Sequence, residues 1–440
     1  MERVLVVMSL VVGSGCVLNP AFDPIETDGG TGAAETEADA PGSSGEPPGD
    51  VPGCGALGPV PADARVVGPD EAPVLANILS EVTPGQTIAL EPGRYPLESI
   101  LNLEVDGVTL RSTTGEAADV VLAPAATLIA GLVINASEVT VAELTFEGGG
   151  GSQLVVSGST RPADDVVAYR LRFLDPVGSA IRTNTGLEGT SADRGLLACS
   201  ELRFTDAARD ARAEDCSAGG ISGFGVWDWT VRDNLFEGFW CPSGYAGVAV
   251  AFSEGSARTL VERNVIRESV QGVVLGLNET FEPKRPTPAC GSGVYFDHVG
   301  GVVRNNAIVS VSEGMAASQF GLDTGLGLWN VCDTKAVHNT VLTAVPAFSS
   351  IEYRFPNTRA TVANNLVTHP IFDRDDAGVP SAGNLEVDLS VFVSPLEGDF
   401  HLRAGSAAVD AGAQLGAEAV THDIDGDVRD EAPDVGADEL

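Results

Sequence analysis

Residues 83–112, TPGQTIALEPGRYPLESILNLEVDGVTLRS, decide the fold of this chain. Glycine, proline and aspartate divide the stretch into short runs rich in β-branched and other apolar residues, which is the pattern of short strands separated by tight turns. Immediately before it, residues 70–82 read DEAPVLANILSEV and place Val74, Leu75, Ile78 and Leu79 at helical spacing. The order predicts one short amphipathic helix followed by a series of short strands.

A three-residue motif then recurs along the rest of the chain. Its units begin at Leu144, Leu171, Leu202, Asn234, Asn264, Asn306, Asn339 and Asn365. The spacing is unequal, and the longest interval separates Asn264 from Asn306. A short strand repeated at unequal intervals indicates a solenoid, in which coils of near-constant strands are joined by loops of variable length.

Five successive units begin with asparagine. Asparagine tolerates the left-handed conformation that a tight turn requires, and stacked amides can hydrogen-bond from one coil to the next. We therefore expect Asn234, Asn264, Asn306, Asn339 and Asn365 to line up at one corner of the solenoid. Their expected role is structural, so they are not candidates for ligand binding.

The predicted helix, PGQTIALEPGRY and VDGVTLRS together resemble the entry to a pectin-lyase-like β-helix, and the resemblance extends over roughly residues 60–395. It implies an all-β fold, a right-handed parallel β-helix over residues 59–395 with a short N-terminal capping helix. Residues 399–440, which contain DFHLRAGSAAVDAGAQ and HDIDGDVRDEAPDVGADE, resemble the tail found after many bacterial β-helix proteins. Because a stack of strands ends in unpaired edges, we expect residues 396–440 to cap that end.

The N-terminus indicates the compartment. Glu2 and Arg3 precede a short apolar run, so residues 1–15 are typical of an export signal and too short for a membrane span. Ser14-Gly15-Cys16 resembles the lipobox of bacterial lipoproteins, which implies that Cys16 carries lipid. The alternative is an ordinary cleaved signal. Residues 16–58 are acidic and rich in Gly, Pro and Ser, as in a disordered tether. The expected location is the cell envelope, at the outer membrane or cell surface.

The composition limits the classes of molecule that the protein is expected to bind. The formal net charge is −37, which repels phosphate backbones, so nucleic acid is not an expected partner. Membrane contact is expected through the lipid anchor only. The resemblance to pectin-lyase-like β-helices, whose relatives act on carbohydrate, implies a polysaccharide or a cell-surface glycan as the partner.

Six cysteines remain after Cys16, and an even number in an exported protein favours disulfides. The candidates are Cys54, Cys199, Cys216, Cys241, Cys290 and Cys332. We expect Cys241 to pair with Cys290, because that bond would fix two loops with little core of their own. No CxxC pair or Cys/His cluster has metal spacing, so no zinc site is expected from the sequence.

One acidic segment is a candidate for calcium. Asp423, Asp425 and Asp427 alternate around a glycine, and such carboxylates can supply hard oxygen ligands. The alternative is that these residues build turns and that Arg429 pairs with one of the acids. No other cofactor is expected.

The candidate catalytic residues are Glu352, Arg354 and Asp323. Strand alternation in SSIEYRF sets Glu352 and Arg354 on one face, opposite Ile351 and Tyr353. A polysaccharide lyase needs a base and a cation that stabilises the developing charge, and an acid–arginine pair could supply part of both. The alternative is an outward ion pair on a solvated strand.

The candidate carbohydrate-binding residues come from the long interval and the coil after it. They are Tyr295, Asp297, His298 and Trp329. The motifs of known pectate lyases and polygalacturonases are missing, so the sequence leaves open whether the protein is an enzyme. The leading interpretation is a surface-tethered β-helix that interacts with carbohydrate without catalysis. The alternatives are a polysaccharide lyase or glycoside hydrolase, and a purely structural envelope protein.

Overall fold

The computed structural model describes residues 54–186, 190–212, 216–277, 279, 287–291, 293–416 and 420–440. The export signal at 1–15, Cys16 and the tether as far as residue 53 lie outside the described residues, and these assignments stay predictions. Among the described helices, none is long and apolar enough to cross a bilayer.

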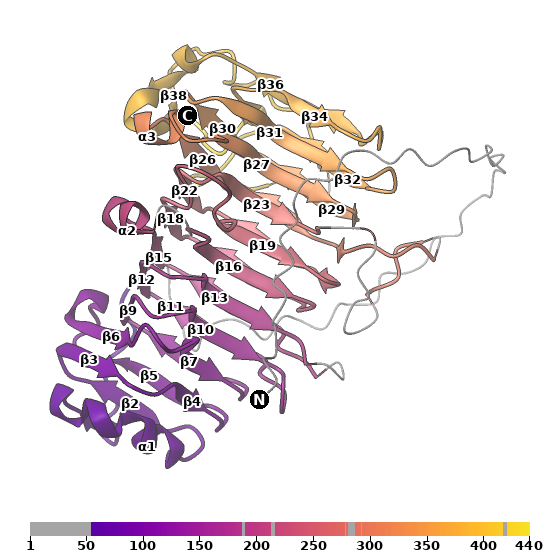
Figure 1. Cartoon of the computed structure of the whole chain (residues 1–440). Coiled ribbons are helices and arrows are strands. Elements are labelled where there is room, and N and C mark those ends of the chain that lie inside the picture. Colours follow the sequence, from indigo (N-terminus) through magenta and orange to yellow (C-terminus); the bar gives the residue numbers. More distant parts are fainter. Residues whose placement is uncertain are drawn as a thin grey trace. The chain divides into compact units, whose positions relative to one another are not determined.

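The described chain winds through three parallel sheets, here called A, B and C (Figure 1). Sheet A contains β1 (Arg65–Val67), β2 (Thr87–Leu90), β5 (Thr109–Ser112), β8 (Thr140–Ala142), β11 (Val167–Tyr169), β14 (Leu196–Ala198), β17 (Thr230–Arg232), β21 (Leu260–Glu262), β25 (Val302–Arg304), β29 (Thr334–Val337), β32 (Ala360–Ala363) and β35 (Ser381–Ala382). Sheet B contains β3 (Gly93–Leu97), β6 (Val120–Pro124), β9 (Thr145–Glu147), β12 (Arg172–Leu174), β15 (Glu201–Arg203), β18 (Leu235–Glu237), β22 (Val265–Arg267), β26 (Ala307–Ser310), β30 (Thr340–Thr343), β33 (Leu366–Val367) and β36 (Leu385–Glu386). Sheet C contains β4 (Leu101–Leu103), β7 (Ala130–Ile134), β10 (Ser152–Ser157), β13 (Ser179–Asn184), β16 (Gly219–Phe224), β19 (Val250–Ser253), β23 (Gln271–Leu275), β27 (Leu322–Trp329), β31 (Ala347–Arg354) and β34 (Ile371–Asp373).

Each coil contributes a strand to sheet A, then to B, then to C, and pairs with the next coil in parallel register. In one coil β17, β18 and β19 follow one another, and they pair with β21, β22 and β23 of the next. A short fourth sheet, formed by β20 (Ser256–Ala257), β24 (His298–Val299) and β28 (Val331–Cys332), lies at the corner between C and A. The expected all-β parallel β-helix is confirmed.

The core is built from columns of side chains that point inward from equivalent positions. Successive strands of sheet B align the inward residues Phe146, Phe173, Leu202, Phe236, Ile266, Ile308 and Val341, all buried. Phe146 and Phe173 stack with ring centroids 5.2 Å apart. Burying each such side chain stabilises the fold by about 1.5–3 kcal/mol, which explains the period-two apolar pattern in each strand.

The asparagines form the predicted ladder at the corner between sheets A and B. The side-chain amide of Asn264 donates to Oδ1 of Asn306 at 2.9 Å, and equivalent bonds join Asn306 to Asn339 and Asn339 to Asn365. Asn234 begins the ladder, and Asn384, which the sequence analysis missed, ends it.

Two details of the expected repeat are wrong. The left-handed residue is the one before each asparagine, for example Arg263 with φ 50° and Asn305 with φ 51°. The unit assigned to Leu202 also begins two residues too late, because Leu202 aligns with Phe173. A shift of two residues leaves the inward and outward faces unchanged, so apolar patterning alone cannot detect it.

The N-terminal end of the core is covered by the predicted helix. Helix α1 (Leu75–Ser80) buries Leu75, Ile78 and Leu79, whereas Val74 is exposed. It follows a 3-10 turn, η1 (Pro69–Val74), in which the Glu71 carboxylate accepts a hydrogen bond from the Gly68 backbone. The other described α-helices, α2 (Asp206–Ala211) and α3 (Glu313–Ala316), lie at the corner between sheets B and C.

Three disulfides join the described cysteines: Cys54–Cys199, Cys216–Cys241 and Cys290–Cys332. The expected Cys241–Cys290 bond is therefore wrong. Cys241 lies at the corner between B and C, whereas Cys290 belongs to the corner between C and A, so each bonds a cysteine at its own corner. The Cα atoms within these pairs are 5.8 Å and 6.3 Å apart.

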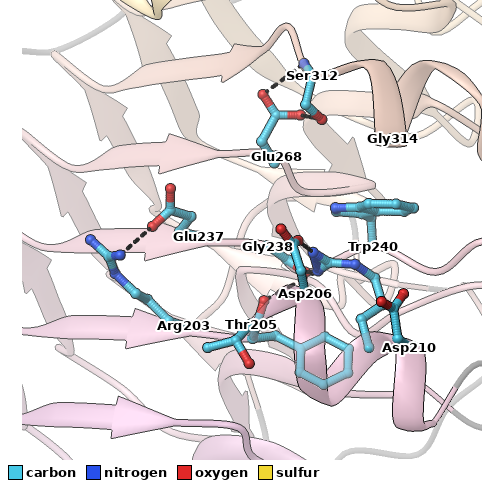
Figure 2. A pocket seen from close by; sticks show the side chains of 12 residues that line it. Arg203, Thr205, Asp206, Asp210, Glu237, Gly238, Trp240, Glu268, Ser312 and Gly314 are labelled. Carbon is cyan, nitrogen blue, oxygen red and sulfur yellow. Dashed lines mark hydrogen bonds and ion pairs between the residues drawn. The ribbon is translucent and has the colours of Figure 1, made fainter.

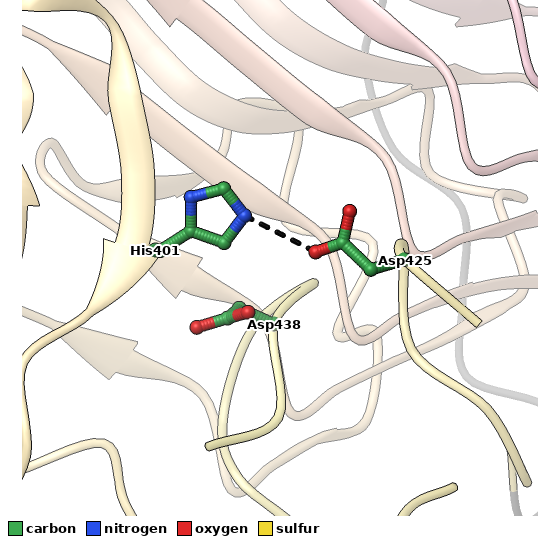
Figure 3. Close-up of side chains that lie close together, drawn as sticks. All are labelled: His401, Asp425 and Asp438. Carbon is green, nitrogen blue, oxygen red and sulfur yellow. Dashed lines mark hydrogen bonds and ion pairs between the residues drawn. The ribbon is translucent and has the colours of Figure 1, made fainter. Parts of the chain in front are cut away.

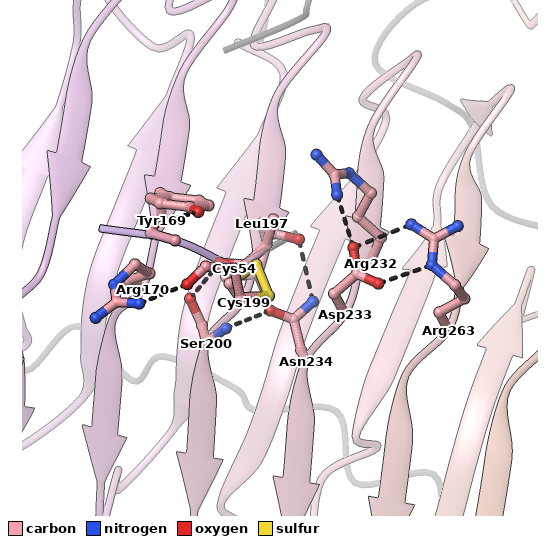
Figure 4. Close-up of a disulfide and its surroundings, with 12 residues drawn as sticks. Cys54, Tyr169, Arg170, Leu197, Cys199, Ser200, Arg232, Asp233, Asn234 and Arg263 are labelled. Atoms are coloured by element: carbon pink, nitrogen blue, oxygen red, sulfur yellow. Dashed lines mark hydrogen bonds and ion pairs between the residues drawn. A yellow bond between two sulfur atoms is a disulfide. The ribbon is translucent and has the colours of Figure 1, made fainter. Parts of the chain in front are cut away.

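The Cys54–Cys199 disulfide holds the segment 54–58 against the outside of sheet A (Figure 4). Tyr169 donates its hydroxyl to the Gly55 carbonyl at 2.7 Å, and Leu57 packs on Tyr169 and Ala142. Residues 54–58 were assigned to the tether, and this part of that assignment is wrong because a disulfide and an apolar contact order them.

The C-terminal tail covers an outer face of the last coils, and its role as a cap over the end of the stack stays a prediction. The last strand of the parallel stack is β36, so the stack stops before residue 395, where the sequence analysis placed its boundary. Strands β37 (Phe392–Ser394) and β38 (Asp399–Leu402) form an antiparallel pair. Phe392 and Leu402 pack on Val309 and Leu342, which point outward from sheet B. The tail therefore shields apolar residues on the outside of the last coils.

Candidate functional site

Polar side chains gather on the outer face of sheet C near its C-terminal end. One outward column runs through Asn102, Val133, Val155, Arg182, Ser222, Ala251, Val274, Gly327 and Glu352. The four positions before β31 in this column carry small or apolar side chains, and at β31 a buried acid follows them. The cluster around it, here called the sheet C cluster, comprises Glu352, Arg354, Arg374, Asp323, Gln271, Trp329, Tyr245 and Phe348.

Glu352 lies at the centre of this cluster and is only 2% exposed. Its carboxylate accepts hydrogen bonds from the indole of Trp329 at 2.9 Å and from the guanidinium of Arg374 at 3.1 Å. The indole can lie across strand β27 because position 327 is glycine. A Cβ at Gly327 would come within 2.9 Å of the Trp329 ring.

Glu352 and Arg354 point to the same face, as expected, but they do not pair with each other. Ile351 and Tyr353 are buried and Glu352 and Arg354 point outward, as alternation requires. The ion-pair partner of Glu352 is Arg374, whereas the Arg354 guanidinium lies over the Trp329 ring at 5.7 Å. Sequence reasoning missed Arg374 because it follows β34, a coil later in the chain.

Asp323 occupies the start of strand β27, beside two other elements. It accepts a hydrogen bond from Gln271 at 2.7 Å, and it interacts electrostatically with the nearby Tyr245 side chain. The Tyr245 ring stacks on Phe320 with centroids 4.1 Å apart and is 49% exposed. Two loops at the corner between B and C therefore bring an aromatic surface beside the acid.

A second exposed ring flanks the cluster. Phe348 is 50% exposed, packs edge-on against Phe372 at 5.4 Å, and lies under the Arg374 guanidinium at 5.5 Å. Phe348 is not among the predicted binding residues. Its signal in the sequence is weak, since an aromatic residue in a strand more often belongs to the core.

Burial controls the acid–base properties of the cluster. It raises the pKa of Glu352, against the opposing effect of the Arg374 hydrogen bond and charge. It also raises the pKa of Asp323, where Gln271 and Arg374 oppose the shift. Both carboxyls therefore hold a proton more readily than an exposed acid. Burial and the neighbouring Asp323 raise the pKa of Tyr245 to about 12.

Three of the predicted binding residues lie away from this face, at the corner between C and A. Asp297 and His298 are fully buried, and Tyr295 donates its hydroxyl to the Asp297 carboxylate. His298 Nε2 lies 2.9 Å from the Thr259 hydroxyl, and burial lowers the His298 pKa to about 3. The structure thus places Trp329 beside Glu352. Tyr295, Asp297 and His298 lie inside a corner of the coil instead, where their partners are other residues of this chain.

A separate pocket of about 580 Å³ lies at the corner between B and C, beside α2 and α3 (Figure 2). Its charged groups have partners: Glu268 accepts from the Ser312 hydroxyl at 2.6 Å, and Arg203 pairs with Glu237 at 3.1 Å. Arg209 donates to the Gly238 carbonyl and lies over the Trp240 ring at 4.1 Å. Because these contacts hold corner loops together, we place the candidate site on sheet C.

The predicted calcium ligands do not converge. Both carboxylate oxygens of Asp423 accept backbone hydrogen bonds, Oδ1 from Asp425 and Asp427 and Oδ2 from Glu439. Asp425 turns toward His401, with its Oδ2 3.1 Å from Nε2, and Asp427 is exposed. Arg429 pairs with Glu439 at 2.8 Å. The segment is a turn organised by Asp423, as the alternative interpretation expects, but the partner of Arg429 is Glu439 and not one of these three aspartates.

No family model and no curated protein matches this sequence. Solved structures do resemble it. The pectate lyase Pel9A superposes with a TM-score of 0.50 at 15% identity, over 83% of this chain and 90% of that one. A rhamnogalacturonan lyase gives a TM-score of 0.49 at 11% identity, over 81% and 90%. At 15% identity, the likeness to Pel9A shows the fold alone, a parallel β-helix.

Proposed function

We propose that this protein binds a polysaccharide over the sheet C cluster. The observation that carries the proposal is the combination, on one outer face, of exposed rings with buried hydrogen-bonding charges. Tyr245 and Phe348 offer flat apolar surfaces on which sugar rings can stack. Glu352, Asp323 and Arg374 offer carboxylates and a guanidinium that can bind sugar hydroxyls and acid groups.

We infer further that the glycan contains uronic acids. A guanidinium matches a carboxylate with two parallel hydrogen bonds, and Arg354 and Arg374 are both part of this cluster. The net charge of −37 opposes the approach of a polyanion, so recognition must come from contacts at short range. Because salt screens the repulsion, we expect moderate salt to strengthen binding.

The second candidate function is glycan cleavage, as a polysaccharide lyase or a glycoside hydrolase. It is favoured by the raised pKa of both Asp323 and Glu352, because a carboxyl that holds its proton more readily than an exposed acid is better suited to act as a general acid. The likeness in fold to the pectate lyase Pel9A is compatible with this candidate.

We also propose that the protein is a lipoprotein of the cell envelope, anchored through Cys16. The proposal rests on the sequence of residues 1–16. Replacing Cys16 by Ala should move the protein from the membrane fraction to the soluble fraction, since acyl chains would be its only anchor. Unchanged membrane association in this variant would contradict the anchor.

The test of glycan binding compares Arg374→Ala with Arg182→Ala. Arg182 points outward from sheet C in an earlier coil, where its guanidinium lies 4.6 Å from the Phe224 ring centroid, so it is a matched control. Affinity for uronic-acid polysaccharides and neutral polysaccharides is measured by calorimetry. We expect at least a tenfold loss in Arg374→Ala and none in Arg182→Ala, with melting temperatures showing that both fold.

The same samples decide between the alternatives. Unsaturated ends in the wild type would establish a lyase, and new reducing ends without unsaturation would establish a hydrolase. Binding without either product supports the non-catalytic function. Absence of binding to every polysaccharide, or an equal loss in the two variants, would refute the sheet C site and favour a purely structural envelope protein.

A further inference from the structure

Three short blocks of the C-terminal tail meet at one point on its surface (Figure 3). His401 comes from β38, Asp425 from the turn that Asp423 organises, and Asp438 from the last three residues. One ligand atom from each, an imidazole nitrogen and two carboxylate oxygens, lies within 4.8 Å of the others. These are the DFHL, DIDGD and GADE blocks of the tail. We propose that His401, Asp425 and Asp438 bind a divalent transition-metal ion of the zinc class.

The backbone around the three side chains is already fixed by hydrogen bonds. The Leu402 amide donates to Oδ2 of Asp438 at 2.7 Å, which joins β38 to the end of the chain. Ile424 donates to the Ala437 carbonyl at 2.9 Å, and this bond joins the turn to the same end. The two acids and the histidine therefore approach one another without a change of backbone.

The histidine is oriented as a metal ligand would be. Its Nδ1 lies 2.6 Å from Oδ1 of Asp399, which leaves Nε2 directed at Asp425. Histidines that bind metals usually donate their other N–H to a carboxylate, which fixes the ring and makes the ligating nitrogen more basic. Asp399 and His401 supply this pair from positions two apart in one strand.

The charges of the cluster suit a dication. Two carboxylates and a neutral imidazole carry a charge of about −2. Asp438 is 5% exposed, so solvent screens its charge little.

The donor set favours zinc over calcium. Calcium takes about 6–8 oxygen ligands, whereas an imidazole with carboxylates suits zinc and its neighbours. Zinc bonds of about 2.0–2.2 Å place two ligand atoms roughly 3–4 Å apart. The three ligand atoms here already lie within 4.8 Å of one another. The sequence predicted no zinc site because its ligands are separated by other segments and lack the usual spacing.

The experiment uses the whole protein without an affinity tag. A chelator first removes bound metal, and the protein is then titrated with Zn²⁺ in a calorimeter. We expect one equivalent to bind, with affinity at least tenfold lower in His401→Gln and in Asp425→Asn. The matched controls are His422→Gln and Asp427→Asn, which lie in the same tail outside the cluster. We expect both controls to bind as the wild type does, and Ca²⁺ to give no comparable binding.

A second measurement keeps the test independent of folding defects. Zn²⁺ should raise the melting temperature of the wild type and of the His422→Gln control, and should leave that of His401→Gln unchanged. Equal melting temperatures of these proteins without metal would show that His401→Gln folds. Absence of stoichiometric binding, or equal affinity in His401→Gln and wild type, would show that His401 only forms ion pairs with Asp399 and Asp425 and would overturn the proposal.

Discussion

Replacing Asn306 by Ala should cost much more stability than the loss of one surface amide. The Asn306 side chain is fully buried and makes five hydrogen bonds. It accepts from the backbone and side-chain nitrogens of Asn264 at 3.0 and 2.9 Å, and donates to Val261, Arg304 and Asn339 at 2.9, 2.9 and 3.0 Å. The substitution removes all five hydrogen bonds. It also leaves the Asn264 amide without its acceptor in the ladder.

The magnitude follows from these contacts. Each buried hydrogen bond contributes about 1 kcal/mol net, so we expect the loss of five bonds to cost about 5 kcal/mol. Asn384→Ala is the matched control, because Asn384 ends the ladder and is only half-buried, with bonds to Asn365 that water can replace. We expect it to lose about 1 kcal/mol.

The assay is urea unfolding, with the midpoint and slope compared among wild type, Asn306→Ala and Asn384→Ala. Hydrogen exchange at the Asn264 amide gives a local readout, and exchange should accelerate in Asn306→Ala. A loss below about 1 kcal/mol in Asn306→Ala, or equal losses in the two variants, would refute the reasoning that the ladder is a cooperative buried network.

Three further perturbations test other parts of the fold. Cys54→Ser opens a disulfide that spans 145 residues, and the chain-entropy relation sets the loss at up to about 5 kcal/mol, measured as the shift in urea midpoint. In Gly195→Ala the new Cβ lies 2.3 Å from the Trp229 ring, so we expect a loss of about 1–3 kcal/mol and altered near-UV circular dichroism; an unchanged spectrum would contradict this packing. Burial lowers the His298 pKa from 6.5 to about 3, so the unfolded chain binds more protons below pH 6.5. Stability should fall as pH falls from 6.5 toward 3, by roughly 2 kcal/mol at pH 5, and His298→Gln should flatten that profile in urea titrations.

The candidate site shows where reasoning from sequence stops. Alternation within one strand predicts that Glu352 and Arg354 share a face, and this is confirmed. The same reasoning pairs Glu352 with Arg354, whereas the structure pairs it with Arg374 of the next coil. Tyr245 reaches Asp323 from a loop two coils earlier. Such contacts depend on the lengths and paths of corner loops, which apolar patterning does not encode.

The sequence by itself determined the parallel β-helix, the N-terminal helix and the asparagine ladder. Each of these depends on a local pattern that recurs in every coil, since inward apolar residues, turn residues and a corner amide repeat with the strands. Only the tertiary structure decided the disulfide pairs, the partners of Glu352, the position of the tail on sheet B and the meeting of His401, Asp425 and Asp438. Stacking brings residues of neighbouring coils within contact distance, but loops of unequal length separate those residues along the chain, so sequence separation does not reveal which of them meet.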